Sequence, residues 1–164
     1  MFLELLFRKL QYDQGAVAPI TPSGYLREYP TNQVSTPCWS SWGEKGYGDY
    51  WCNGTNAWVY RHLHKMAERM AELARRYPNA DGLQRLALNQ AAREVMLAQA
   101  SDWAFIMKTG TTVQYATKRT VDHVSRFTRI YEGLTNGALD EALIAEVSRR
   151  DNLFPDIDYR VYAT

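Results

Sequence analysis

Three long stretches of the chain repeat apolar residues at steps of three and four, which is the spacing of a helix with one buried face. They cover residues 56–77, 81–99 and 111–136. A proline follows the first stretch, Asp81 stands where a cap would open the second, and an Asn-Gly pair breaks the third. The pattern therefore predicts three long helices.

Shorter apolar stretches predict further helices. One covers residues 2–12, a second opens with Thr21 as N-cap and a proline at its first position, and a third begins at Ser101 or Asp102 and stops at Gly110. A last helix is expected over residues 139–150, and strand-like alternation of useful length is lacking. We expect an all-α helical bundle of three long and several short helices, forming a single domain over residues 1–164.

The helix predicted for residues 2–12 is apolar nearly all round at Leu5, Leu6 and Phe7, so it requires cover on more than one side. Its apolar run is short and contains Glu4, which argues against a signal peptide. A run of about 20 apolar residues, as needed to span a membrane, is absent from the sequence. We expect a cytoplasmic protein without a membrane partner.

Composition excludes some partners and leaves one feature to explain. With 19 basic and 18 acidic side chains the net charge is +1, which gives no sign of a nucleic-acid partner. Aromatic residues make up 13% of the chain, with five Trp and eleven Tyr. Large rings in excess of what a core needs often form binding surfaces, and stacking on sugar rings is one such use.

Metal and cofactor chemistry finds no support in the residue spacing. Cys38 and Cys52 stand fourteen apart without metal-ligand spacing, so we expect free, buried thiols. His62 and His64 face different directions on a helical turn and have no identifiable third ligand. Phosphate-binding loops and nucleophile elbows are also missing, and we therefore predict no metal and no cofactor.

A loop over residues 31–54 lacks a sustained period and is rich in glycine and aromatic rings. Long loops of this kind are usually functional. Trp42 and Trp51 lie nine apart on it, among glycines that permit sharp turns and close approach of a ligand. The rings could stack on pyranose faces or close the end of the bundle, and the residues alone leave both interpretations open.

The carboxylates near these rings do not form a recognisable catalytic pair. Glycosidases need two carboxylates flanking the scissile bond, for which Glu44, Asp49 and Asp102 are the candidates. We expect Glu44 to pair with Lys45 in solvent and Asp102 to cap a helix. No catalytic residue is assigned in this chain.

Several segments resemble, in order, the C-terminal helical domain of 1,4-α-glucan branching enzymes of glycoside hydrolase family 57. The most specific is Ser40-Ser41-Trp42-Gly43-Glu44-Lys45-Gly46-Tyr47, followed by Trp51. Residues 8–14 with 21–23, residues 99–110 and residues 152–155 add to it. Together these segments span almost the whole chain.

The resemblance implies an enzyme that cleaves an α-1,4-glucan, holds the fragment on a glutamate and transfers it to a 6-hydroxyl, which is retaining chemistry. In the family the nucleophilic Glu and the acid/base Asp belong to a distorted (β/α) barrel upstream of the matched segments. Neither has a counterpart in this sequence. The chain is therefore expected to be inactive without the barrel.

Residue by residue, the resemblance carries over a substrate-binding role. Trp42 and Trp51 match family tryptophans implicated in glucan binding, and Asp102 with Trp103 matches a segment that approaches the active site. The main hypothesis is a domain that binds α-glucan and completes the cleft of the barrel. The alternative is a free-standing helical interaction module of the same family without catalytic activity.

Overall fold

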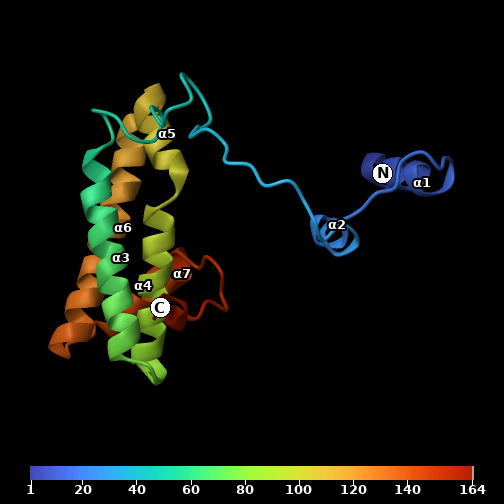
Figure 1. Cartoon of the computed structure of the whole chain (residues 1–164). Coiled ribbons are helices and arrows are strands. Elements are labelled where there is room, and N and C mark those ends of the chain that lie inside the picture. Colours follow the sequence, from blue (N-terminus) through green and yellow to red (C-terminus); the bar gives the residue numbers. More distant parts are fainter. Residues whose placement is uncertain (164) are drawn as a thin grey trace. The chain divides into compact units, whose positions relative to one another are not determined.

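The computed structural model describes residues 1–163, and those residues form helices and loops without strands (Figure 1). The elements are α1 (Phe2–Tyr12), α2 (Pro22–Glu28), α3 (Trp58–Arg76), α4 (Gly82–Ala98), α5 (Ser101–Thr109), α6 (Val113–Asn136), α7 (Glu141–Arg150) and the 3-10 helix η1 (Tyr159–Tyr162). The predicted all-α class is confirmed, with α3, α4 and α6 as the three long helices.

The chain divides into two compact units, residues 1–39 and a second unit that begins at Ser40. The single domain over residues 1–164 stays a prediction. The first unit holds α1 and α2, in which the structure buries no residue. Leu5, Leu6 and Phe7 of α1 are exposed in it.

Helix ends show which capping predictions were right. Thr21 caps α2, because its Oγ1 accepts a hydrogen bond from Gly24 N–H at 3.1 Å. Gly110 ends α5 in the left-handed conformation that glycine favours. The expected cap of α5 was wrong: Ala100 occupies the N-cap position, so neither Ser101 nor Asp102 caps that helix.

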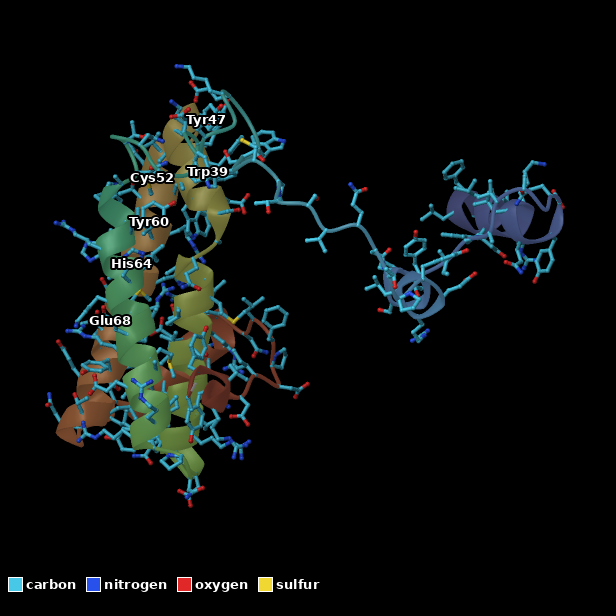
Figure 2. The ribbon with its side chains drawn as sticks, in the orientation of Figure 1. Trp39, Tyr47, Cys52, Tyr60, His64 and Glu68 are labelled. Carbon is cyan, nitrogen blue, oxygen red and sulfur yellow. The ribbon has the colours of Figure 1, made fainter. Side chains whose placement is uncertain are left out.

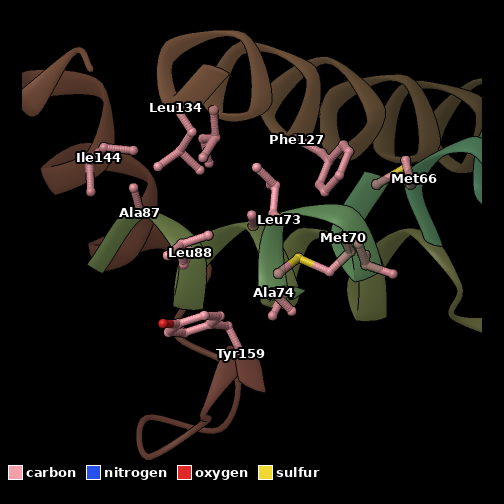
Figure 3. Packing of buried hydrophobic residues seen from close by; sticks show 14 of the residues in the cluster. Met66, Met70, Leu73, Ala74, Ala87, Leu88, Phe127, Leu134, Ile144 and Tyr159 are labelled. Atoms are coloured by element: carbon pink, nitrogen blue, oxygen red, sulfur yellow. The ribbon is translucent and has the colours of Figure 1, made fainter. Parts of the chain in front are cut away.

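The second unit is built around α3, α4 and α6, which run side by side in Figure 1. Their apolar stripes meet in a main core, part of which Figure 3 shows. Fully buried members include Met70, Leu73, Leu88 and Phe127. The three- and four-residue spacing that predicted these helices is thus the spacing of their buried faces. Among the described residues, no helix combines the length and apolar character needed to cross a membrane.

Tyr159 of η1 completes the core from outside the predicted helices (Figure 3). Its hydroxyl donates to Tyr77 O and accepts from Ala80 N–H at 3.3 Å, and its own N–H donates to Asn89 Oδ1 at 3.0 Å. A four-residue helix is too short to leave a periodic signal, which is why the sequence pattern did not predict it.

A buried polar network links α4 to α6. Glu94 and His123 are both fully buried, and His123 Nδ1 lies 2.7 Å from Glu94 Oε2. The other oxygen of Glu94 accepts from Gln90 Nε2 at 2.8 Å. Arg126 extends the network with an ion pair to Asp151 at 2.7 Å, just after α7. Buried polar groups of this kind are tolerated because each has partners.

Candidate functional site

The loop that precedes α3 is held in shape by hydrogen bonds within the loop itself. Ser41 N–H donates to Gly46 O at 2.6 Å, and Ser41 Oγ accepts from Gly48 N–H at 2.6 Å. Trp51 N–H donates to Gly48 O at 2.9 Å. These bonds fold residues 41–51 into a compact turn at the end of the unit where Figure 2 labels Tyr47.

Gly43 is required in this turn for two reasons. Its φ of +81° lies in the left-handed region that favours glycine. A Cβ at this position would also lie 2.8 Å from Cδ2 of Tyr50, closer than real contacts allow. The missing side chain therefore lets the loop lie directly on the Tyr50 ring.

Four rings come together on this loop and on α5, and we call Trp42, Tyr50, Trp51 and Phe105 the ring cluster. Tyr50 and Phe105 stack at 5.3 Å between ring centroids. Trp42 lies 5.7 Å from Phe105 and 6.4 Å from Trp51. Aromatic pairs at such distances attract one another beyond their burial, so each ring helps to fix the others.

An open hollow of about 340 Å³ lies on the ring cluster. Its lining residues are Trp42, Trp51, Ser101, Asp102 and Phe105. The structure thus brings three of the predicted site residues together, with Asp102 in the first turn of α5 and exposed. Flat rings beside a carboxylate suit a sugar, whose C–H face packs on a ring while its hydroxyls donate to the carboxylate.

Trp103, the fourth predicted residue, lies beside this hollow and does not line it. Its Nε1 donates to Leu97 O at 2.7 Å, and its ring meets Tyr115 edge-on at 6.0 Å. It lines a separate cavity of about 130 Å³ that also touches Trp51. The half-buried ring packs against the small core formed by Val59, Met107 and Ala116.

Charged and titratable groups around the loop mostly tie it to the helices. Glu44 pairs with Lys108 of α5 at 3.4 Å, which corrects the expected pairing with Lys45. Tyr60 of α3 donates its hydroxyl proton to Trp51 O. Burial, and secondarily the nearby Cys52, raises the pKa of Tyr60, so this hydroxyl stays protonated as a donor.

The cysteines and the candidate metal ligands do not belong to this site. Cys38 and Cys52 are free as expected, but both are exposed, which corrects the predicted burial. Glu94, His123 and Asp151 have ligand atoms within 4.8 Å of one another. Arginines already supply positive charge there, and we interpret the group as part of the structural network. The absence of a metal stays a prediction.

Three residues of the site were missed by the sequence reasoning. Phe105 stands three positions after Asp102 on the same face of α5, so helical spacing alone could have grouped them. Tyr50 lies within the aromatic loop but carries no signal that separates it from its neighbours. Asn56, whose side-chain amide donates to Tyr50 O of the loop at 2.9 Å and to Ala104 O of α5 at 3.0 Å, has no sequence signal.

Comparison with known proteins adds independent information. A family model described as the C-terminal region of 1,4-alpha-glucan branching enzyme matches residues 62–162. The 1,4-alpha-glucan branching enzyme TK1436 of Thermococcus kodakarensis is 32% identical over 152 residues, covering 89% of this chain and 22% of that protein. The chain therefore spans about a fifth of the length of this curated relative.

Solved structures resemble almost the whole chain. The α-amylase AmyC from Thermotoga maritima is 41% identical with a TM-score of 0.72, covering 99% of this chain and 30% of its own. The GH57-type branching enzyme from Pyrococcus horikoshii is 32% identical with a TM-score of 0.76, and the match covers 94% of this chain and 30% of that enzyme. TK1436, solved in complex with glucose and additives, is 30% identical with a TM-score of 0.80, and the match covers 99% of this chain and 29% of that chain.

Proposed function

The chain belongs to the family of C-terminal domains of GH57 1,4-alpha-glucan branching enzymes, and we propose that it binds α-glucan and completes the cleft of a catalytic barrel. The ring cluster is the proposed contact surface. Trp42 and Trp51 stack on glucose units, and Asp102 accepts hydrogen bonds from their hydroxyls. Trp103 does not line the hollow and is proposed to act indirectly, by lining the neighbouring cavity together with Trp51.

The observation that carries this proposal is the state of Trp42. Its ring packs against the rings of Tyr50, Trp51 and Phe105, and yet 67% of its surface is exposed. A side chain that only closed the end of the bundle would be buried by those contacts. An ordered ring that stays open to solvent beside a hollow is instead typical of a ligand surface.

Catalysis is proposed to come from another part of a longer polypeptide. The chain covers 22% of TK1436 and about 30% of the similar solved structures, so most of each relative lies outside the matched region. Two carboxylates of this chain lie near the ring cluster, and neither is proposed as a catalytic acid. Glu44 forms an ion pair with Lys108. Asp102 is proposed to accept hydrogen bonds from sugar hydroxyls. The chain alone is proposed to transfer or hydrolyse no glucan.

The likeness to AmyC favours a second candidate. Identity to that α-amylase is 41%, against 32% and 30% for the two solved branching enzymes. The same ring cluster could then serve an enzyme that hydrolyses the glucan instead of transferring it. In a barrel-containing polypeptide, α-1,6 branch points without new reducing ends indicate branching, whereas new reducing ends without branch points indicate hydrolysis.

Binding by the chain itself tests the glucan-binding part of the proposal. Electrophoresis in native gels containing amylopectin compares the chain with Trp42→Ala and with Leu86→Ala, an exposed apolar truncation on α4. We expect amylopectin to retard the chain and Leu86→Ala equally, and Trp42→Ala much less. Equal retardation of all three would favour a helical interaction module that does not use this surface for glucan.

A further inference from the structure

Asn56 is fully buried in the turn just before α3, and its side chain forms hydrogen bonds to three backbone groups. Its Nδ2 donates to Tyr50 O at 2.9 Å and to Ala104 O of α5 at 3.0 Å. Its Oδ1 accepts from Asn53 N–H at 2.9 Å. The side-chain amide therefore uses both of its N–H groups and its oxygen at once.

These bonds join the two parts of the chain that supply the ring cluster. Tyr50 belongs to the cluster and precedes Trp51, and both stand on the loop. Ala104 precedes Phe105, which α5 contributes. One side chain thus fixes the backbone beside rings from both elements.

Only an amide meets the demands of this position. Both carbonyl oxygens accept from Asn56 Nδ2, and Asn53 N–H donates to Asn56 Oδ1. A carboxylate of the same shape would place negative charge 2.9 and 3.0 Å from the two carbonyl oxygens. An alanine would remove these bonds from three partly buried backbone groups, and hydrogen bonds lost away from solvent are costly.

We propose that Asn56 is the positioning residue of the glucan surface, holding the loop to α5 so that the ring cluster is formed before any sugar arrives. Asn56 does not line the hollow on the ring cluster and acts through the rings. The inference rests on the proposed function for its consequence in binding, but the ordering of the rings can be tested without glucan. Preformed surfaces bind more tightly because ordering is not left to the ligand.

The test compares the chain with Asn56→Asp, which keeps the shape and removes the donors. Asn79→Asp is the matched control, because Asn79 is exposed in the turn between α3 and α4. Near-ultraviolet circular dichroism reports the packed rings, far-ultraviolet circular dichroism reports the helices, and calorimetric titration with maltoheptaose reports affinity. Trp42→Ala shows how much of the near-ultraviolet signal comes from the ring cluster.

We expect Asn56→Asp to lose the ring signal that Trp42→Ala also loses, to keep its helical signal, and to bind maltoheptaose at least tenfold more weakly. Asn79→Asp should match the unmodified chain in all three. Retention of both the ring signal and the affinity by Asn56→Asp would overturn the inference. If the unmodified chain binds no maltoheptaose while Asn56→Asp still loses the ring signal, the proposed function fails and the positioning role stands.

A second variant covers the case in which Asn56→Asp loses its helices. Asn56→Ala introduces no charge, and it is then measured by the same three methods. Loss of the ring signal with retained helices supports the local role. Unfolding of both variants overturns it, because Asn56 would then hold the whole unit together rather than one surface.

Discussion

Replacing Glu94 by glutamine should destabilise the bundle strongly, because the surrounding network cannot rearrange to accept an amide. Arg119 Nη2 lies 3.0 Å from His123 Nε2, and a guanidinium only donates, so Nε2 must accept. The proton of His123 is therefore on Nδ1, facing Glu94 Oε2 at 2.7 Å. Both protein partners of the Glu94 carboxylate, His123 and Gln90, are donors.

The orientation of the Gln90 side-chain amide is fixed in the same way. Arg93 Nη1 donates to Gln90 Oε1 at 3.0 Å, which leaves the Nε2 of Gln90 toward Glu94. In Glu94→Gln one of the two donors must meet an NH₂ group. The variant loses one hydrogen bond to a charged acceptor and buries an unpaired donor, and together these cost about 2–4 kcal/mol.

Urea unfolding followed by far-ultraviolet circular dichroism measures this change. With a slope of about 1.5 kcal/mol per molar urea, a loss of about 3 kcal/mol lowers the midpoint by about 2 M. Glu68→Gln is the matched control, because Glu68 pairs with Lys65 at 3.0 Å on the exposed face of α3. Exposed pairs contribute about 0–1 kcal/mol, so the control should shift little. Equal midpoints for the two variants would refute the account of a fixed network.

Three further changes test other parts of the structure. Tyr159→Phe removes a buried hydroxyl with two backbone partners and should cost about 1–3 kcal/mol in urea unfolding, whereas an unchanged midpoint would mean that these bonds add nothing. Gly43→Ala should abolish the near-ultraviolet signal of the rings, because its Cβ would meet Tyr50 at 2.8 Å; a normal spectrum would contradict the close contact. Hydrogen bonds from Arg160 lower the pKa of Asp158 to about 2, below the value of about 3.9 in an unfolded chain. The ionised carboxylate therefore stabilises the fold above about pH 4, and this stabilisation is lost as the pH falls toward 2. The difference in melting temperature between the chain and Asp158→Asn should therefore shrink over that interval, and a constant difference would argue against the ion pair.

The sequence predicted the helices well because their stability comes from periodic apolar faces. The stripes of α3, α4 and α6 extend over several turns, and each turn repeats the signal. Capping was predicted less well, since a cap depends on one side chain whose geometry the loop decides. Asp102 illustrates this, because the helix begins two residues earlier than a cap at that position requires.

The candidate site could be predicted only in part. Trp42, Trp51 and Asp102 were named in advance, and the structure places them around one hollow. Tyr50 and Asn56 escaped notice, because their importance comes from contacts made by folding rather than from spacing along the chain. Their roles follow from distances that only the structure shows.

The central claim is that Trp42 contacts glucan and does not close the bundle. Its most direct test is the rate of α-1,6 branch formation by a barrel-containing polypeptide carrying Trp42→Ala, measured together with the urea midpoint of the same change in this chain. We predict a midpoint that corresponds to a change within about 1 kcal/mol, since the ring is largely exposed, and a branching rate reduced at least tenfold. The claim would be contradicted if Trp42→Ala left the rates of branching and hydrolysis undiminished. It would also be contradicted if Trp42→Ala lowered the free energy of unfolding by about 3–5 kcal/mol, as truncation of a buried aromatic ring does.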